Sequence, residues 1–335
     1  NLPPSMPKHT FLLISRKPLS PILTKTANVK SLVVPAKNFW HLVKLPSILK
    51  KQKPDLYIEP SGDLPPFAPK KSIVFIHDLA FKYFKNAYTK KELFLLNKTI
   101  KSASAAAGII FMSENTKKDF YKFAGGNKAK TIVSYPGTDV DFFSKTNSTK
   151  LPSAYPKKYI LFVGRLETRK NIVGILKAFQ MIKKNPKIKE KLILVGKFGN
   201  GQREIEKIIN APDFPKQELF LPGFVDDSLI PTLYQNATLF LFPSLYEGFG
   251  IPILEAFAAK IPVVTSNSSS LPEVVADAAL VADPKNPADI ANKALEILEN
   301  PTLAKELVKK GSLRLKNFSW QKSAENYKKL IEEIL

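Results

Sequence analysis

The chain has 335 residues, of which 44% are hydrophobic, so it is long and apolar enough to bury a core in each of two ordinary domains. It contains no cysteine, which excludes a disulfide framework, a thiolate metal site and redox chemistry at sulfur. Its formal net charge of +22 is concentrated in residues 1–150, which carry 25 Lys and Arg against 9 Asp and Glu.

In the first half of the chain, short β-branched runs alternate with amphipathic helical segments. This alternation is typical of a parallel sheet covered by helices on both faces, so the predicted class is α/β throughout. The predicted strands are residues 10–14, 29–34, 56–58, 72–76, 108–111 and 131–134, and the main predicted helices are 42–50, 91–102 and 116–123.

The second half of the chain repeats this architecture without a detectable short sequence repeat. Its predicted strands are residues 159–163, 191–195, 219–221, 239–242, 263–265 and 279–281, and its predicted helices are 172–182, 203–209, 228–235, 252–259 and 287–299. Residues 143–155 are polar, contain proline and lack periodicity, which is typical of an interdomain linker. We therefore predict two α/β domains, in residues 1–150 and 151–317, and a last amphipathic helix in 318–335.

The segment Y-I-L-F-V-G-R-L-E-T-R-K-N-I, residues 159–172, is a buried strand that stops at Gly164 and continues through a cationic loop into a helix. Arg165, Arg169 and Lys170 lie at or just before the helix N-terminus. Cations there oppose the helix dipole unless an anion lies among them, and a phosphate group is the natural anion. A solvent-facing loop with screened charges explains the same pattern, so both interpretations stay open.

The segment P-S-L-Y-E-G-F-G-I-P-I-L-E-A-F-A-A, residues 243–259, follows another apolar strand. Gly248 and Gly250 allow the backbone to approach a ligand, and the following helix points its free N–H groups at the same place. Glu247 precedes this helix and Glu255 lies about one turn inside it, where both can accept hydrogen bonds from sugar or ribose hydroxyls. Alternatively, Glu247 caps the helix and Glu255 is a surface residue, although the neighbours of Glu255 are apolar.

The spacing of these two glutamates within E-G-F-G-I-P-I-L-E-A resembles the signature of the group 1 retaining glycosyltransferases of the GT-B fold. Four further segments follow the order of that family: F-I-H-D-L-A-F (75–81), V-G-R-L-E-T-R-K-N (163–171), L-P-G-F-V (221–225) and S-S-S-L-P-E-V (268–274). The resemblance runs from about residue 10 to the end and is strongest after residue 155. The first of these segments is similar to bacterial polysaccharide mannosyltransferases.

The resemblance implies two Rossmann-like domains whose parallel sheets face each other across a cleft. Residues 1–150 would form the acceptor-side domain and residues 151–317 the nucleotide-sugar-binding domain. Residues 318–335 would pack back toward the first domain, whereas burial in their own domain is the ordinary alternative.

For the donor site, the resemblance implies roles residue by residue. Gly164, Arg165 and Lys170 would belong to the diphosphate site, where the two cations also stabilise the leaving nucleotide. Glu247 would contact the donor sugar, and it would be joined there by the backbone of Gly248, Phe249 and Gly250.

The remaining donor contacts would come from three other places. Glu255 would accept hydrogen bonds from the ribose, and the loop with Phe224 and Val225 would lie against the base. His77 ends a first-domain strand, and it would approach the transferred sugar because open α/β sheets bind ligands at strand carboxyl ends. A structural role is the alternative for a lone histidine.

The implied reaction transfers a hexose from a nucleotide sugar to a hydroxyl of a glycan or lipid-linked acceptor, with the anomeric configuration kept. GDP-mannose is favoured as the donor, and UDP-sugars remain open. Cations and helix N-termini would meet the charge of the departing diphosphate, so neither a metal nor a further cofactor is expected. The triplet Asp139–Val140–Asp141 matches the D-x-D motif of another glycosyltransferase fold, but it follows the turn S-Y-P-G-T and so short a motif often arises by chance.

The sequence differs from the family pattern at the start of the chain. Similar proteins have a strand, a glycine-rich loop and a long helix before the strand predicted at residues 10–14, and we find no such unit here. We therefore expect a better formed donor half than acceptor half. A non-catalytic nucleotide-sugar-binding protein or partner subunit is the alternative function.

The basic first half, with a net charge of +16 from 25 basic and 9 acidic residues, has two interpretations. It could meet anionic lipid headgroups or an acidic acceptor, or it could be an ordinary lysine-rich surface. A basic protein that binds nucleic acid or a membrane surface is a third function hypothesis, although nucleic acid is disfavoured because aromatic residues do not interleave with the basic ones. The longest apolar stretches are far shorter than the roughly 20 residues that cross a bilayer. No signal peptide is predicted, so the expected location is the cytoplasm, with peripheral contact to the inner face of the membrane.

Overall fold

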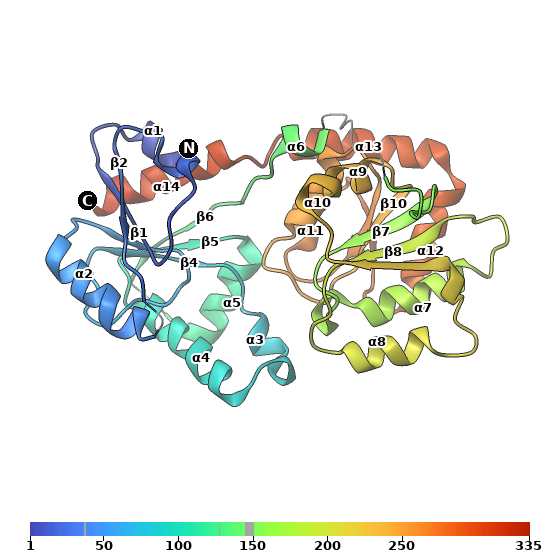
Figure 1. The fold of residues 1–335 in the computed structure, drawn as a ribbon, viewed down its shortest axis with the longest axis horizontal. Helices are drawn as coiled ribbons and strands as arrows, with labels where there is room; N and C mark the ends of the chain where they lie inside the picture. The colour runs from blue at the N-terminus through green and yellow to red at the C-terminus, as the bar shows by residue number, and fades with distance from the viewer. Residues whose placement is uncertain (37, 127, 145–150) are drawn as a thin grey trace. The chain divides into compact units, whose positions relative to one another are not determined.

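The computed structural model describes residues 1–335 except 37, 127 and 145–150. The chain forms two compact units (Figure 1). The first unit comprises residues 1–79, 89–136 and 319–335, and the second comprises residues 80–88 and 137–318. Part of the predicted linker, and the predicted boundary at residue 150, fall on 145–150 and so lie outside the described residues.

The first unit contains two parallel sheets. The larger has the order β3-β4-β5-β6, and β1 pairs with β2 in a separate two-stranded sheet. The strands are β1 (Phe11–Ser15), β2 (Val29–Val33), β3 (Tyr57–Glu59), β4 (Ser72–Ile76), β5 (Gly108–Phe111) and β6 (Lys130–Val133). The helices are α1 (Leu2–Ser5), the 3₁₀ turn η1 (Pro21–Thr24), the π-helical η2 (Trp40–Lys44), α2 (Leu45–Gln52), α4 (Lys90–Ser104), α5 (Glu114–Ala124) and α14 (Trp320–Ile334).

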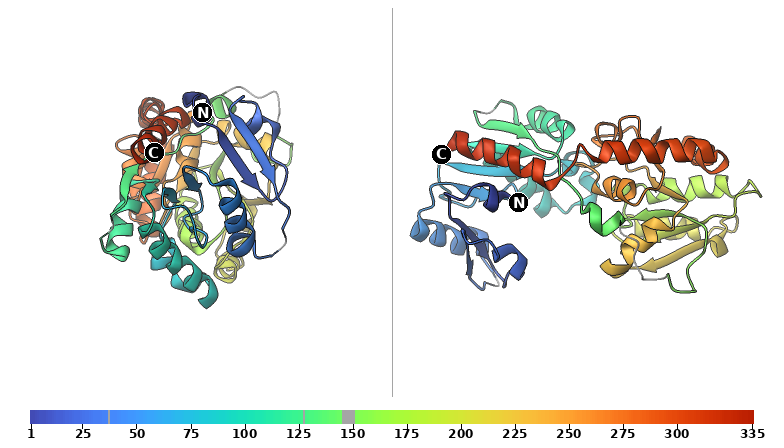
Figure 2. Two further views of the ribbon diagram at one scale, coloured as in Figure 1. Left: turned by 90° about the vertical axis from the view of Figure 1, so that its left-hand side faces the viewer. Right: turned by 90° about the horizontal axis from the view of Figure 1, so that it is seen from above.

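The last helix, α14, packs against the first unit's sheet (Figure 2). Gly108 of β5 makes this packing possible, because a Cβ at this position would lie 2.6 Å from Ile334 Cδ1. Leu330 is 1% exposed, and the Ser323 hydroxyl donates a hydrogen bond to the Tyr135 carbonyl at 2.6 Å. The end of the chain therefore completes the core of a unit that begins with residue 1.

The second unit is one six-stranded parallel sheet with the order β12-β11-β10-β7-β8-β9. Helices α7 and α8 lie on one side of it, and α9, α10 and α11 on the other (Figure 1). The strands are β7 (Tyr159–Val163), β8 (Lys191–Val195), β9 (Leu219–Gly223), β10 (Leu239–Phe242), β11 (Val263–Ser266) and β12 (Leu280–Ala282). The α-helices are α3 (Ala80–Tyr83), α6 (Val140–Ser144), α7 (Ile172–Ile182), α8 (Gln202–Ile209), α9 (Ile230–Gln235), α10 (Ile251–Ala258), α11 (Leu271–Val275), α12 (Pro287–Glu299) and α13 (Pro301–Leu315), and the 3₁₀ turns are η3 (Lys85–Ala87), η4 (Thr168–Lys170), η5 (Lys216–Glu218) and η6 (Asp227–Leu229).

The predicted α/β class with parallel sheets is confirmed in both units. Helix α13 was not predicted, although its start carries a clear signal: the Asn300 side chain accepts a hydrogen bond from the Leu303 N–H at 3.1 Å, and Pro301 occupies the first helical position. Short α6 and α11 were also missed.

The strand order of the second unit defines where a ligand is expected. From β7 the chain runs outward to β8 and β9, and it then returns to the other side of β7 with β10. Loops that leave β7 and β10 therefore diverge at the carboxyl edge of the sheet. Open α/β sheets bind ligands in the crevice at such a reversal point.

Glycines at the carboxyl ends of three neighbouring strands bring their backbones close together. The Gly164 N–H donates to the Val195 carbonyl at 3.0 Å, and the Gly196 N–H donates to the Gly223 carbonyl at 2.8 Å. Gly196 has φ +143°, and a Cβ there would lie only 1.9 Å from the Gly164 carbonyl oxygen. No other residue fits at this position without displacing the loop after β7.

We expect Gly196→Ala to destabilise the protein by about 2 kcal/mol or more, because it combines a backbone clash with a strained φ. Urea or thermal unfolding would measure the loss. Gly126→Ala is the matched control, since a Cβ there meets nothing within 4 Å, and it should change stability by less than about 0.5 kcal/mol. Equal stability of the two variants would contradict the packing described for Gly196.

Candidate active site

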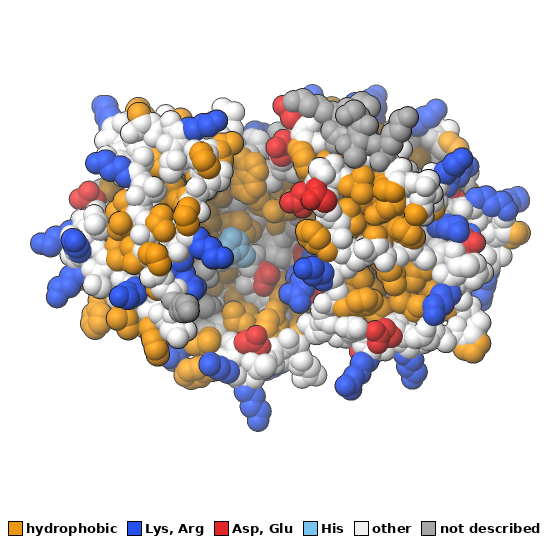
Figure 3. All heavy atoms as spheres, in the orientation of Figure 1, with side chains coloured by type: hydrophobic (Ala, Val, Ile, Leu, Met, Phe, Trp, Pro, Cys, Tyr) orange, Lys and Arg blue, Asp and Glu red, His pale blue; other side chains and the backbone are white. Residues whose placement is uncertain are grey.

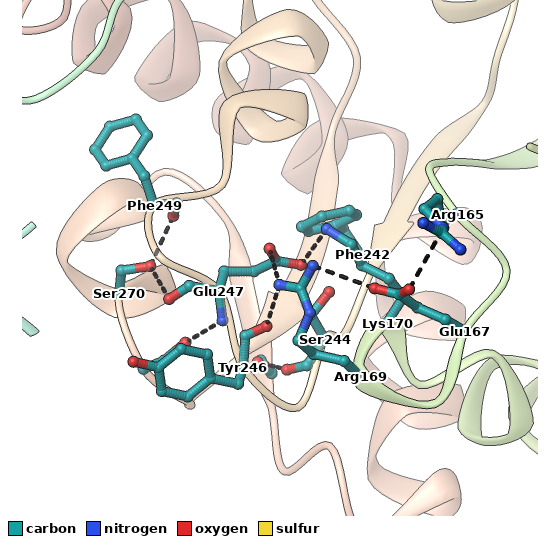
Figure 4. Close-up of polar contacts among 12 residues, drawn as sticks. Arg165, Glu167, Arg169, Lys170, Phe242, Ser244, Tyr246, Glu247, Phe249 and Ser270 are labelled. Atoms are coloured by element: carbon teal, nitrogen blue, oxygen red, sulfur yellow. Dashed lines mark hydrogen bonds and ion pairs between the residues drawn. The ribbon is translucent and has the colours of Figure 1, made fainter. Parts of the chain in front are cut away.

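A buried carboxylate shared by two cations lies at the reversal point between β7 and β10 (Figure 4). Glu247 follows β10 and is 5% exposed. Its Oε1 accepts a hydrogen bond from Lys170 Nζ at 2.6 Å, and its Oε2 accepts one from Arg169 Nη1 at 3.0 Å. Both cations follow β7, so this cluster joins the two loops that diverge at the sheet edge.

The loop after β7 is held in place by the loop after β8. The Leu166 N–H donates to the Lys197 carbonyl at 2.9 Å, and the Gly199 N–H donates back to the Leu166 carbonyl at 2.9 Å. Two residues further on, the Thr168 N–H donates to the Asn200 carbonyl at 3.1 Å. The chain then forms η4, which carries Arg169 and Lys170 into the cluster.

Asn171 fixes the junction between η4 and α7. It has a left-handed backbone with φ 61°, and its buried amide donates to the carbonyls of Pro243 at 3.0 Å and Pro284 at 2.7 Å. Gly174 makes room for this side chain, because a Cβ there would lie 2.5 Å from the Asn171 Oδ1. The amide thereby ties the cationic loop to the first residue after β10.

Two serines at the start of α11 hold the backbone around Glu247. The Glu247 N–H donates to the Ser269 hydroxyl at 2.8 Å. The fully buried Ser270 hydroxyl lies 3.0 Å from the Glu247 carbonyl and 2.8 Å from the Phe249 carbonyl, and it can donate to either. Glu247 is thus positioned by three strands: β7 through the cations, β10 directly, and β11 through these serines.

The two arginines of the cationic loop lie in different environments. Arg169 has a side chain 20% exposed, and it donates to Glu167 Oε1 at 3.2 Å and to the Tyr246 carbonyl at 3.1 Å. Arg165 has a side chain 70% exposed, and its Nε lies 3.6 Å from Glu167 Oε2. Three cations therefore surround two carboxylates, and Arg165 keeps most of its surface open to solvent. Such an arrangement satisfies the buried carboxylates and leaves positive charge for an incoming anion.

Helix α10 begins beside this cluster. Gly250 precedes it with φ +115°, and a Cβ there would lie 2.8 Å from Leu271 Cδ2. No side chain caps the first turn of α10, whose residues are all described. Gly248 and Phe249 join Glu247 directly to this turn, and the predicted contact of their backbone with the donor sugar stays a prediction.

Glu255 has a protein partner that the sequence did not suggest. The hydroxyl of the fully buried Tyr234 donates to Glu255 Oε2 at 2.8 Å. Burial raises the pKa of Glu255 above its ordinary value of 4.5, and the Tyr234 hydrogen bond offsets part of that rise. This contact accounts for a carboxylate in an apolar stretch, and the predicted contact with a ribose stays a prediction.

The raised pKa of Glu255 predicts a pH dependence of stability. The folded state keeps a proton that the unfolded state has lost, so the stabilisation present below about pH 4.5 is lost as pH rises through the folded pKa. The side chain of Glu255→Gln cannot ionise. As the pH rises above about 4.5, the free energy of unfolding of the wild type should therefore fall relative to that of Glu255→Gln. Denaturant unfolding at a series of pH values measures the difference. Parallel pH profiles for the two proteins would contradict the raised pKa.

Phe224 and Val225 follow β9 at the same carboxyl edge. Phe224 is 68% exposed, and Lys197 Nζ lies 5.1 Å from the centre of its ring. Val225 is buried at 7% exposure. An exposed aromatic face beside a lysine can stack on a planar group, which is compatible with the predicted contact to a base.

His77 belongs to the first unit, where it directly follows β4. Its side chain is exposed, and Nε2 lies 2.7 Å from the Pro60 carbonyl oxygen. Because a carbonyl can only accept, Nε2 carries the hydrogen in this contact. Its predicted approach to the transferred sugar stays a prediction.

The D-x-D triplet has a local structural role. Asp139 Oδ1 accepts a hydrogen bond from the Phe142 N–H at 3.0 Å at the start of α6. Over residues 1–335 apart from 37, 127 and 145–150, no group of three or more His, Asp or Glu side chains is arranged to hold a metal ion. In the same described part of the chain, no helix is both long and apolar enough to cross a bilayer.

Sequence reasoning assigned no role to several side chains that build this site. Arg169 was noted only as part of a cationic loop, whereas it is the second cation on Glu247. The sequence predicts no individual roles for Glu167, Asn171, Ser269 and Ser270, which lie in the motif segments V-G-R-L-E-T-R-K-N and S-S-S-L-P-E-V. Those segments were the available signal for these residues.

A sequence model of the family "Glycosyl transferases group 1" matches residues 143–314, and the chain belongs to this family. This confirms the family predicted from the motifs.

Curated relatives include two mannosyltransferases of Escherichia coli. The O-antigen chain mannosyltransferase B is 29% identical over 279 residues, which cover 82% of this chain and 73% of that protein. The serotype-specific mannosyltransferase WbdA is 27% identical over 266 residues, which cover 76% of this chain but only 32% of that protein.

Solved structures establish the fold. Sucrose-phosphate synthase from Thermosynechococcus elongatus superposes with a TM-score of 0.73 at 19% identity, covering 96% of this chain and 88% of that one. WaaG, a glycosyltransferase involved in lipopolysaccharide biosynthesis, superposes with a TM-score of 0.71 at 14% identity, covering 98% and 92%. Both are GT-B glycosyltransferases, so the predicted GT-B fold is confirmed.

Proposed function

We propose that the protein is a retaining hexosyltransferase that moves a sugar from a nucleotide sugar to a hydroxyl of a glycan or lipid-linked acceptor. GDP-mannose is the favoured donor, because both curated relatives named above are mannosyltransferases. UDP-sugars are the alternative donors. The structure of Anabaena HepE, which was solved in complex with UDP and glucose, superposes on this chain with a TM-score of 0.72 at 17% identity.

The observation that carries this proposal is the cluster of Lys170, Arg169 and Glu247 at the reversal point of the second sheet. When the bond between the anomeric carbon and the phosphate breaks, negative charge grows on the departing diphosphate. Fixed cations and a helix N-terminus at the place where charge develops are an effective means of lowering such a barrier. Lys170, the exposed Arg165 and the start of α10 supply these elements in one unit.

The same cluster suits Glu247 to a second task. Its two oxygens are oriented by Lys170 and Arg169, and further lone pairs remain for sugar hydroxyls. A carboxylate fixed in this way discriminates between sugars by the position of their hydroxyls. Because the diphosphate charge is met by protein groups, the proposal includes no metal and no further cofactor.

Donor binding should depend on Lys170. We expect GDP or GDP-mannose to raise the melting temperature of the wild type, since a ligand selective for the folded state stabilises it. Lys170→Ala should raise the dissociation constant of the donor by about tenfold or more, because it removes a charged partner of the diphosphate. Calorimetry with GDP, UDP, GDP-mannose and UDP-glucose measures this and names the base.

Lys177→Ala is the matched control, because Lys177 lies on the exposed face of the adjoining helix α7. It should bind the donor as the wild type does. If no nucleotide binds, or if both lysine variants lose affinity equally, the assigned donor site is wrong. Tight binding without transfer would instead identify the alternative, a non-catalytic nucleotide-sugar-binding protein.

Transfer should keep the anomeric configuration of the donor and should survive removal of metal. With GDP-α-D-mannose and synthetic mannosyl acceptors, the new linkage should be α, which the one-bond carbon–hydrogen coupling at C1 reports by NMR. Excess EDTA should leave the initial rate unchanged. A β-linked product, or a rate abolished by EDTA and restored by a divalent cation, would refute these two parts of the proposal.

A further inference from the structure

Tyr234 of α9 is a fully buried tyrosine whose hydroxyl meets Glu255 of α10. Its Oη donates to Glu255 Oε2 at 2.8 Å. Its ring contacts two other aromatic rings, that of Phe143 in α6 at 5.4 Å and that of Phe240 in β10 at 5.1 Å between ring centres. Because protein cores are closely packed, the hydroxyl cannot turn away from Glu255 unless these rings repack.

Both sequence neighbours of Tyr234 are fixed to other elements of the second unit. The Leu233 carbonyl accepts a hydrogen bond from the buried Tyr159 hydroxyl of β7 at 2.7 Å. On the other side, Gln235 Nε2 donates to the Phe143 carbonyl at 2.7 Å. The sheet and α6 therefore set the position of the Tyr234 hydroxyl.

The Glu255 carboxylate is incompletely satisfied by the protein. Most Lys and Arg side chains on the face of the second unit in Figure 3 project from its rim into solvent, whereas Glu255 is half-buried. In the described part of the chain it takes part in no ion pair, and only its Oε2 accepts a hydrogen bond. A carboxylate has about four acceptor positions, and removal from water with a single neutral donor is costly. Oε1 is therefore suited to accept from a ligand hydroxyl.

Glu255 lies one helical turn beyond the start of α10. The helix begins at Ile251, and a rise of about 1.5 Å per residue places Glu255 about 6 Å further along its axis. In a nucleoside diphosphate the ribose is joined directly to the phosphates. Phosphates at the start of α10 therefore bring the ribose hydroxyls to the turn that carries Glu255.

We propose that Tyr234 is a positioning residue that makes the donor site select ribonucleotides. Its hydroxyl holds Oε2 of Glu255, so that Oε1 is presented to the ribose hydroxyls of the donor. A site built to bind a hydroxyl rejects an analogue that lacks it, because the acceptor is then left unpaired. Tyr234 is too deeply buried to touch the ligand and acts only through Glu255. This inference rests on the proposed function and extends it to the sugar of the nucleotide.

Calorimetry with GDP and 2′,3′-dideoxy-GDP, and with the corresponding pair of uridine nucleotides, tests the proposal. The wild type should bind the ribonucleotide of its preferred base at least about tenfold more tightly than the dideoxy analogue. Tyr234→Phe keeps the buried ring and removes only the hydroxyl. It should lower this affinity ratio by about fivefold or more, through weaker binding of the ribonucleotide. A merely structural role of Tyr234 would weaken both nucleotides equally and leave the ratio unchanged.

Tyr159→Phe is the matched control, because it also removes one buried tyrosine hydroxyl, and the acceptor of that hydroxyl is the residue next to Tyr234. It should lower the melting temperature as Tyr234→Phe does, yet keep the wild-type affinity ratio. Glu255→Gln should lower the ratio at least as far as Tyr234→Phe. Adding Tyr234→Phe to Glu255→Gln should lower it no further, since residues that act through one another are not additive.

The outcomes separate this inference from the proposed function. If the wild type binds neither GDP nor UDP, the proposed function is overturned and the role of Tyr234 with it. If the wild type binds one of them but binds its dideoxy analogue equally well, only the ribose selectivity is overturned. The role of Tyr234 alone is overturned if Tyr234→Phe keeps the wild-type ratio, or if Tyr159→Phe lowers that ratio as much.

Discussion

The second unit depends on a buried carboxylate that is shared by two cations. Glu247 is buried and would be costly to ionise alone, and Lys170 and Arg169 compensate for its charge with two direct hydrogen bonds. The partners come from the loops after β10 and β7, which diverge at the reversal of strand order. This ion cluster therefore serves both as the link between those loops and as the charged centre of the site.

Several other residues of the second unit hold this ion cluster in position. The Asn171 amide binds two carbonyls across the sheet edge, and Gly174 leaves room for it. Gly196 lets the backbone after β8 approach that after β7 closely enough to support the cationic loop. Ser269 and Ser270 hold the Glu247 backbone from the side of β11. Backbone packing, rather than side-chain packing alone, sets the positions of the charges.

The sequence predicted the sheets well because their strands are short, apolar and bounded by Gly, Pro or polar residues. β4, β5, β7, β8 and β10 begin and end at the predicted residues. The direction of side chains could not be predicted from the sequence. Arg165 and Lys170 were assigned the same role, yet the Arg165 side chain is 70% exposed and that of Lys170 only 12%. The pairing of Glu255 with Tyr234 joins residues 21 positions apart through tertiary packing, which local periodicity does not encode.

The packing of α14 on the first unit has a consequence for how the protein folds as it is synthesised. The strands and helices of residues 159–315 are contiguous in sequence and precede α14, so the second sheet can form as soon as these residues have been synthesised. The first unit must wait for residues 319–335, because Leu330 and Ile334 cover Gly108 and its neighbours on β5. We therefore expect the first unit to become protease-resistant after the second, although residues 1–79 are synthesised before any part of the second unit.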